Sequence, residues 1–484
     1  MSLFQFKQGS KHTLFKAWML GLLWVFTPPL CADDLPQLGE TSSLYLSPKK
    51  EYEIGQIVVA QIKNQGLVWD DPLVSEYIRQ LQHRLTGKSK ADLPEWFILQ
   101  DRSLNAFALP GGFIGIHSGL IETLQDEDEL AAVLAHEWAH VSQHHLARLA
   151  EQSGLMNLST LAGALASIAI ATQNPSAGAG AMSATLGGAS QSRINFTREN
   201  EEEADRIGMQ ILANTGFDPR AMPDVFLYFQ REERYLGHKI PEILSTHPLS
   251  ASRIADASNR ADHYPKKSRA HSLTFLLVKT RLNLLEQTTT KKNPQLATAF
   301  LDEIQTENKE AVQTYAKAIA AILEDDQHLA CSTLQAAPNA HPYFRLAEAE
   351  CTAGLGQYQT AQTMLNNVLA TTPQYRPAVI LKAEFLLQEK QVLPAVTLLQ
   401  RYLRSAKNDS AVYQLLAKAF NQQKDMPRMH EAEAEYRFHS GDYYGALSQY
   451  QMALKLCKNQ TIAEKRIQAK IKMTQTKIHQ IRAL

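Results

Sequence analysis

The sequence has no excess of charge of either sign, because its 49 Lys and Arg residues equal its 49 Asp and Glu residues. Proteins that bind nucleic acid usually carry a basic surplus that contacts the phosphates. We therefore expect no nucleic-acid partner. Long apolar runs are also missing, since the run over residues 17–26 is shorter than the about 20 apolar residues that a membrane-spanning helix needs.

Cysteine is scarce, and the whole chain contains Cys31, Cys331, Cys351 and Cys457. If Cys31 leaves with a signal peptide, the other three allow at most one intramolecular bridge and leave a free thiol. Cys331 and Cys351 are the only pair close in sequence. This usage permits export to a compartment where disulfides form, and it does not decide whether that pair is bridged.

The first residues of the chain have the features of a targeting segment. Lysines precede the apolar run over residues 17–26, and the small residue Ala32 follows it. This order predicts a signal peptide over residues 1–32 that is cleaved near Ala32. The alternative is an N-terminal anchor that is not cleaved.

A chain of 484 residues is too long for one hydrophobic core, so we expect at least two domains. Residues 33–265 mix short strand-like runs, turns and helices, which predicts a mostly helical α+β domain with a small sheet. Residues 266–307 have the pattern of a helical linker. Residues 308–484 consist almost entirely of amphipathic helix with little glycine.

The helical part of the chain contains an internal repeat of about 34 residues, the length of a tetratricopeptide unit. The clearest unit begins at Pro342, and a shortened unit precedes it. We predict roughly four imperfect units that stack as an all-α solenoid, with an irregular helical bundle as the alternative. Small residues recur where two helices would approach, and large residues recur in the groove between them: Ala318, Ala330, Ala349, Tyr358, Ala361, Leu365, Ala383, Ala395, Leu399, Ala417, Phe420, Ala434, Tyr443, Ala446 and Tyr450.

A second unusual segment lies at residues 154–192, which are apolar at first and then rich in glycine and alanine. The pattern predicts a hairpin of two apolar helices. Serine and threonine interrupt the apolar run, which argues against a membrane span. Three interpretations stay open: a lid over an active site, a hairpin that contacts a membrane, or a pair of core helices.

The motif with the most chemical content is HEWAH at residues 136–140. On a helix, His136 and His140 leave the same face about one turn apart. That spacing suits two ligands of one tetrahedral zinc ion. Glu137 lies beside the first ligand, where it could take a proton from zinc-bound water and return it to the leaving amine.

A zinc site of this kind needs a third protein ligand. If the helix continues, His144 and His145 lie too far along or around it to complete the site, so we interpret both as structural or surface residues. Glu201 and Asp205 share a helix face in a later segment. Glu201 would supply the third ligand and Asp205 would orient a ligating histidine. The alternative is a solvated acidic helix start.

The HEWAH motif at 136–140, the EEEAD segment at 201–205 and the segment at 105–112 together closely resemble the metallopeptidase family of CAAX prenyl proteases and HtpX-type heat-shock proteases. The resemblance covers about residues 50–260. It implies a zincin-like metallopeptidase domain with one Zn²⁺ per chain. It also implies that His136, His140 and Glu201 bind the zinc, that Glu137 is catalytic and that Asp205 supports the catalytic site.

With a signal peptide in front and tetratricopeptide units behind, the chain resembles periplasmic members of this family that act in outer-membrane β-barrel assembly. The resemblance implies a periplasmic endopeptidase with chaperone-like activity. Its partners would be the barrel assembly machinery and barrel precursors such as the lipopolysaccharide-transport barrel. We expect a monomer, and peripheral membrane contact stays open.

Two further segments have predicted roles in this site. Asn105, Ala106, Phe107 and Ala108 would form an edge strand that holds an extended substrate by strand addition; a purely structural hairpin is the alternative. His247 precedes a proline and therefore lies outside regular helix.

Related exported proteins carry the same Thr-His-Pro sequence as His247. We hypothesise that His247 is a fourth zinc ligand that displaces the water and silences the enzyme; a loop histidine without this role is the alternative. Arg253 could help to polarise the substrate carbonyl.

A function from another class also remains open. The protein could act mainly as a chaperone or adaptor that binds clients through its repeats, without proteolysis. The presence of Glu137 together with three candidate ligands favours an enzyme.

Overall fold

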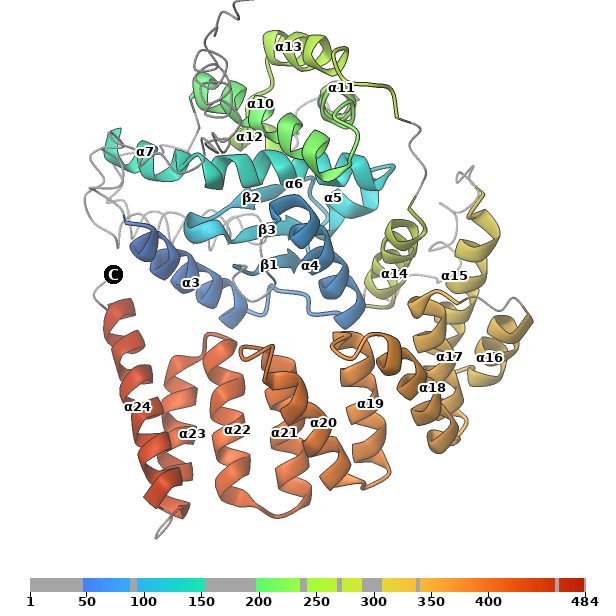
Figure 1. Ribbon diagram of the computed structural model, residues 1–484, viewed down its shortest axis with the longest axis vertical. Coiled ribbons are helices and arrows are strands. Elements are labelled where there is room, and N and C mark those ends of the chain that lie inside the picture. The colour runs from blue at the N-terminus through green and yellow to red at the C-terminus, as the bar shows by residue number, and fades with distance from the viewer. Residues whose placement is uncertain are drawn as a thin grey trace, which may run out of the picture.

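The computed structural model describes residues 47–87, 94–152, 197–235, 242–267, 272–289, 307–336, 340–457 and 461–482. The predicted signal peptide and the predicted hairpin at 154–192 lie outside the described residues. Figure 1 shows an N-terminal domain resting on a row of repeat helices. None of the described helices has the length and apolar content that crossing a membrane would require.

A small sheet forms the middle of the N-terminal domain. Its order is β1 (Trp96–Leu99), β3 (Ile114–His117) and β2 (Ala106–Ala108), with β1 parallel and β2 antiparallel to β3. The turn from β2 to β3 needs positive φ angles, which Gly111 and Gly112 supply at 77° and 92°. The strand order places β2, in the segment that begins at Asn105, at an edge of the described sheet.

Helices enclose this sheet. The two faces of the sheet meet different helices: Trp96 and Ile98 of β1 cluster with α4 and α6, whereas Phe97 and Leu99 cluster with α3. Figure 1 shows α10, α11 and α13 beyond α6. The strands are short and buried, so the helices supply most of the core. The helices of this domain are α3 (Pro48–Asn64), α4 (Pro72–Thr86), α5 (Ser118–Thr123), α6 (Glu127–Ser142), α7 (His145–Gln152), α10 (Arg198–Thr215), α11 (Ala221–Tyr235), α12 (Glu242–Thr246) and α13 (Ala251–Ala261).

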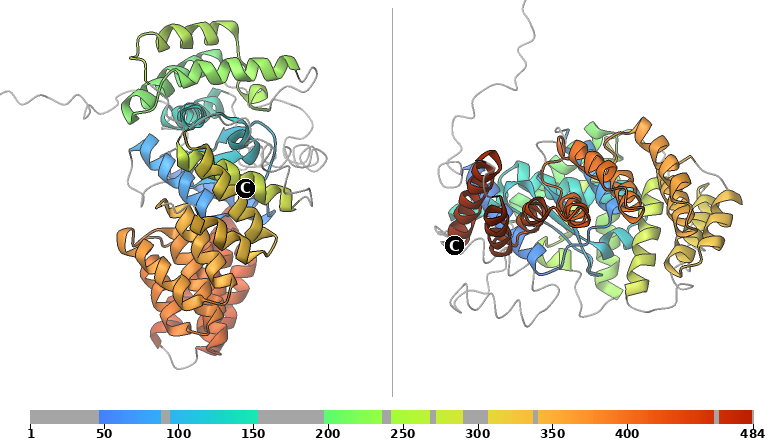
Figure 2. Two further views of the ribbon diagram at one scale, coloured as in Figure 1. Left: turned by 90° about the vertical axis from the view of Figure 1, so that its right-hand side faces the viewer. Right: turned by 90° about the horizontal axis from the view of Figure 1, so that it is seen from below.

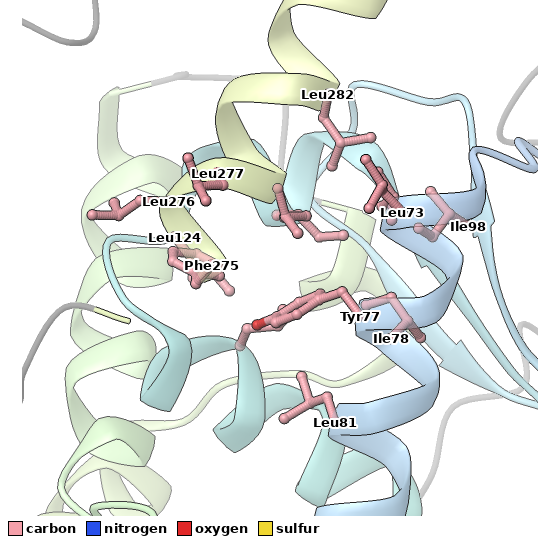
Figure 3. Packing of buried hydrophobic residues seen from close by; sticks show 14 of the residues in the cluster. Leu73, Tyr77, Ile78, Leu81, Ile98, Leu124, Phe275, Leu276, Leu277 and Leu282 are labelled. Atoms are coloured by element: carbon pink, nitrogen blue, oxygen red, sulfur yellow. The ribbon is translucent and has the colours of Figure 1, made fainter. Parts of the chain in front are cut away.

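The segment predicted as a linker contains α14 (Leu273–Thr289), which is helical as expected. It does not act as a spacer, because Phe275, Leu277 and Leu282 are fully buried. Figure 3 shows these residues beside Tyr77 of α4. At least this part of residues 266–307 therefore belongs to the core of the molecule.

The repeats form an all-α solenoid, as predicted. Figure 2 shows from below that its helices follow one another along a curved row. The predicted small residues Ala349, Ala361, Ala383 and Ala446 are fully buried, because the helices approach closely at these points. The helices are α15 (Lys309–Leu323), α16 (Gln327–Ala336), α17 (Pro342–Gly354), α18 (Tyr358–Thr371), α19 (Arg376–Gln388), α20 (Val392–Leu403), α21 (Ser410–Gln422), α22 (Met426–His439), α23 (Tyr443–Leu456) and α24 (Thr461–Arg482).

The N-terminal domain contacts the repeats at several helix ends. Arg376, the first residue of α19, forms hydrogen bonds of 3.0 and 3.1 Å with Asp70, which precedes α4. The hydroxyl of Tyr343 donates to the carbonyl of Leu73 at 3.0 Å. These contacts hold α4 against the repeats.

The cysteine pair that the sequence left undecided is bridged. Cys331 of α16 and Cys351 of α17 form a disulfide, and Cys457 is a free, buried thiol. The bridge joins the first two helix pairs of the solenoid.

Candidate metal centre

Helix α6 carries HEWAH in the middle of the domain. Asp126 caps its N-terminus by accepting a hydrogen bond from the backbone N–H of Glu129 at 2.9 Å. Every residue from Leu130 to His140 is buried. The motif therefore lies on a helix that is covered on all sides, where the surrounding protein excludes water.

Helix α10 brings the acidic motif to α6. Thr197 caps α10, and Glu201 lies in its first turn, where the helix dipole favours negative charge, while Asp205 follows one turn later on the same face. Gly208 permits a close approach, because a Cβ atom at this position would lie 3.3 Å from the backbone nitrogen of His136. The packing of these two helices thus places both carboxylates beside the histidines.

Four buried side chains bring possible ligand atoms within 4.8 Å of one another: His136, His140, Glu201 and His247. The Nε2 atoms of His136 and His140 are 3.0 Å apart, and each lies 3.5 Å from a carboxylate oxygen of Glu201. Nδ1 of His247 lies 3.4 Å from Nε2 of His136 and 2.9 Å from Oε1 of Glu201. A tetrahedral ion with bonds of about 2.0–2.1 Å separates its ligand atoms by about 3.3 Å. The four residues therefore fit one tetrahedral metal ion.

Asp205 and Arg253 support this group from behind. Oδ1 of Asp205 lies 2.9 Å from Nδ1 of His136, on the side of the ring away from the other ligands. Arg253 forms two hydrogen bonds of 2.7 Å with Asp205 and an ion pair of 2.8 Å with Glu201. The guanidinium of Arg253 is thus engaged with the carboxylates of the site, which differs from the predicted role of polarising a substrate carbonyl.

These contacts shift the pKa values of the site. Burial alone would lower the pKa of His136, but hydrogen bonds with Asp205 and Glu201 raise it to about 10. Burial alone would raise the pKa of Glu201, but the neighbouring His247 and His136 hold it well below the usual range. A metal ion would displace the proton of His136, because a ligating imidazole is neutral.

Glu137 is fully buried and lies next to the ligand group, with Oε1 3.5 Å from Nε2 of His247. Burial raises its pKa, against the influence of His247 and His136. A carboxylate with a raised pKa is suited to accept a proton and release it again. Because α6 packs against the edge strand β2, that strand runs past this carboxylate.

His247 lies at the end of α12 and is 5% exposed. Two contacts fix the start of this short helix to the loop before β2. The backbone N–H of Ile243 donates to the carbonyl of Leu104 at 3.1 Å, and the hydroxyl of Ser103 donates to Glu242 at 3.1 Å. The segment therefore reaches from the edge of the sheet to the ligand group.

An apolar pocket adjoins His136 and His247. Helix α11 supplies four of its lining residues, and α6, α12, the loop after α12 and the start of α13 supply the others. The pocket could hold an apolar side chain beside the ligand group. Its apolar lining residues are Val133, Met222, Val225, Phe226, Phe229, Ile243, Leu244 and Leu249.

The two histidines that follow the motif have different surroundings. The group of possible ligands found in the described part of the chain contains neither of them. His144 lies partly exposed, 3.3 Å from Glu51. His145 is fully buried, and its Nδ1 lies 2.8 Å from Nδ1 of His140. Sequence reasoning missed this contact because it assumed a continuous helix, whereas α6 ends at Ser142.

Two separate parts of the chain match known protein families. Residues 72–261 match peptidase family M48, and residues 353–419 match the tetratricopeptide repeat. The first match contains all four possible ligands and Glu137. The chain is therefore a metallopeptidase with tetratricopeptide repeats.

Several relatives match most of the chain. The beta-barrel assembly-enhancing protease of Escherichia coli (strain K12) is 35% identical over 427 residues, which cover 86% of this chain and 85% of that protein. The protein of the same name from Yersinia pestis is 33% identical over 395 residues, or 80% of each chain. The mitochondrial metalloendopeptidase OMA1 of Bos taurus is 32% identical over 286 residues, which cover 53% of this chain and 51% of that one. Because the matches extend through both domains, this chain belongs to the family of beta-barrel assembly-enhancing proteases.

Proposed function

We propose that this protein is a periplasmic zinc endopeptidase that promotes assembly of outer-membrane β-barrel proteins and degrades those that assemble wrongly. The observation that carries the proposal is the group of His136, His140 and Glu201 with the buried carboxylate of Glu137 beside it. The names of the bacterial relatives support the substrate class. By this proposal, residues 1–32 direct the chain to the periplasm and are removed near Ala32.

The ligand set supports zinc, because nitrogen and carboxylate ligands in a tetrahedral arrangement are typical of this ion. When bound, zinc supplies a polarised carbonyl and a water of lowered pKa. Glu137 takes the proton of the attacking water and passes it to the leaving amine. Asp205 holds the ring of His136, while Arg253 balances the charge of both carboxylates of α10.

An extended substrate would bind along β2, at residues 105–108. Strand addition uses main-chain hydrogen bonds, so it tolerates many sequences and requires an unfolded segment. The apolar pocket beside His136 suits an apolar side chain of that segment. A barrel precursor that has not closed offers both features, since its strands are unpaired and apolar residues alternate with polar ones along each strand.

His247 would act as a reversible fourth ligand. A site with four protein ligands has no position for water and is inactive. His247 and the substrate would compete, because α12 is attached to the loop that leads into β2. The barrel assembly machinery and precursors such as the lipopolysaccharide-transport barrel are the proposed partners that release this segment.

Zinc content and cleavage of an unfolded substrate test the core of the proposal together. We expect one zinc ion per chain in the wild type and in Glu137→Gln, and loss of zinc in Glu201→Ala. Cleavage should fall about 10²–10⁴-fold in Glu137→Gln, the usual range for a general base. Glu202→Gln is the matched control, because Glu202 is exposed on the same helix. A Glu137→Gln protein that still cleaves would contradict the assignment.

The regulatory role of His247 has a separate test. His247→Ala should cleave unfolded substrate faster than the wild type at equal zinc content. Equal rates would refute the fourth-ligand role and leave the rest of the site intact.

The chaperone alternative is decided in cells. If Glu137→Gln restores barrel assembly to a deletion strain but does not degrade a misassembled precursor, both activities exist. If neither the wild type nor His247→Ala cleaves any substrate, the protein is a binding module alone.

A further inference from the structure

The chain turns sharply after the zinc-binding motif and returns His145 to the site. Helix α6 ends at Ser142, and His144 adopts a left-handed conformation with φ of 54° before α7 begins. As a result the His145 ring packs against the His140 ring, with centroids 4.8 Å apart and planes at 82°. The two Nδ1 atoms are 2.8 Å apart. This is a hydrogen-bond distance between the far nitrogen of a metal ligand and a second, fully buried imidazole.

The geometry determines which atom donates. His140 directs Nε2 toward the ligand group, since that atom lies 3.0 Å from Nε2 of His136. A neutral imidazole that ligates through Nε2 carries its proton on Nδ1. Nδ1 of His140 therefore donates to Nδ1 of His145. The proton of a neutral His145 is then on Nε2.

The far side of His145 meets a carboxylate. Its Nε2 lies 3.1 Å from Oε2 of Glu203. The same oxygen accepts a hydrogen bond of 3.0 Å from Arg148, which also donates to the carbonyl of Gln143 at 2.6 and 3.1 Å. Glu203 is thus held in place by α7 and by the turn that positions His145.

Both histidine ligands therefore connect to a carboxylate of α10. His136 reaches Asp205 directly at 2.9 Å, whereas His140 reaches Glu203 through His145. Glu201, two residues before Glu203, belongs to the ligand group itself. Carboxylates behind ligating histidines fix the orientation of the ring and strengthen the ligand.

We propose that His145 and Glu203 are positioning residues that hold His140 for the metal, as Asp205 holds His136. The relay runs from the Glu203 carboxylate through both imidazoles to the ligating Nε2. Its effect is tighter metal binding and one defined orientation of the His140 ring. The inference rests on the zinc binding proposed above.

Zinc affinity measured by competition with a chelator of known affinity tests the relay on the full-length protein. We expect His145→Phe, which keeps a ring but no nitrogen, to bind zinc about 10–100-fold more weakly, the usual loss for such partners. Glu203→Gln should weaken binding by a smaller factor. Glu202→Gln removes the same charge from an exposed neighbour and should leave the affinity unchanged.

A conservative replacement separates hydrogen bonding from packing. The side-chain oxygen of His145→Asn takes the place of Nδ1 and can accept the Nδ1–H of His140, so this variant should recover most of the affinity lost in His145→Phe. The absorption spectrum of the cobalt-substituted protein should change in His145→Phe and stay near the wild type in His145→Asn. Thermal unfolding in the presence of a chelator should be similar for the two variants.

The outcomes are distinct. Wild-type affinity in both His145→Phe and Glu203→Gln would overturn the relay while leaving the zinc peptidase intact. Equal loss in His145→Phe and His145→Asn, with an unchanged cobalt spectrum, would also overturn it. A wild-type protein that binds no zinc would instead refute the function on which the inference rests.

Discussion

The candidate metal centre and the contact between the two domains each contain a buried arginine that pairs with two carboxylates. Arg253 is 3% exposed and binds Asp205 and Glu201, which lie on one helix and belong to the site. Arg376 is 9% exposed and binds Asp70 and Asp409. Both arginines form two ion pairs, but the carboxylates of Arg253 lie on one helix and those of Arg376 lie on different elements.

This placement decides what each arginine stabilises. The partners of Arg253 remain close together without it, so its removal leaves two like charges buried side by side. Asp70 lies before α4 and Asp409 caps α21, so Arg376 joins the N-terminal domain to the repeats. We infer that the first arginine maintains a local charge balance and that the second maintains the relative position of two domains.

The largest effect is expected from Arg253→Met. Removing one partner of a buried ion pair costs about 3–5 kcal/mol, and here Glu201 and Asp205 keep the protonated His136 as a shared cation, so we expect the lower end of that range. Unfolding in denaturant, measured with a chelator present, should show this loss. Saturating zinc should recover part of it, because the ion supplies positive charge at the same place. A loss below about 1 kcal/mol with chelator would contradict the charge-balance role.

Local periodicity predicts two parts of the molecule, the repeats and the HEWAH motif. The repeats follow from the chain directly, since residues such as Ala349 and Ala361 recur at the spacing where neighbouring helices touch. The HEWAH motif is equally local, because the helix period places His136 and His140 on one face. In both cases residues close in sequence make the contact, and periodicity is sufficient.

Contacts that depend on a turn or on distant packing were beyond this kind of reasoning. His145 meets His140 only because His144 adopts a left-handed conformation, which a helical extrapolation from residues 136–140 cannot anticipate. The burial of α14 depends on the position of α4, nearly two hundred residues earlier. The sequence predicts a different role for Arg253, because the spacing of the two residues does not show that it contacts Asp205.

The second prediction is that acid weakens the N-terminal domain before the repeats. His117 is fully buried, and burial lowers its pKa from 6.5 to about 4 although Asp101 opposes the shift. As the pH falls below 6.5, His117 is protonated in the unfolded chain but stays neutral in the folded domain. The stability from neutral His117 is therefore present above pH 6.5 and is lost as the pH falls toward 4, by up to about 3 kcal/mol.

Glu435 in the repeats titrates in a lower range. Burial would raise its pKa, but His439 and Lys470 lower it to about 2. Its contribution is present above pH 4.5 and is lost only as the pH falls toward 2. Between pH 6.5 and 5 the contribution of His117 should therefore fall while the contribution of Glu435 stays constant.

Fluorescence can follow the two domains separately, because the tryptophans outside the predicted signal peptide are Trp69, Trp96 and Trp138, all in the N-terminal domain. Tryptophan emission should report a lower denaturant midpoint at pH 5 than at pH 7, while the helical circular dichroism of the repeats changes less. In His117→Gln the shift in emission should shrink. An equal shift in the variant would assign the pH dependence to other groups.

The smallest effect is expected from Arg376→Met. Asp70 is 43% exposed, so water compensates it, and the buried Asp409 keeps hydrogen bonds from the Tyr402 hydroxyl and the backbone N–H of Val412. We therefore expect a cost of about 1–2 kcal/mol. Because Arg376 joins two domains, tryptophan emission and circular dichroism should unfold at midpoints that are further apart than in the wild type. Arg345→Met is the matched control, since Arg345 is 45% exposed and pairs with Glu348 within α17. If Arg376→Met and Arg345→Met instead shift one shared transition by the same amount, Arg376 stabilises only the repeats. Arg253 and Arg376 would then differ in their burial and not in whether they connect two domains.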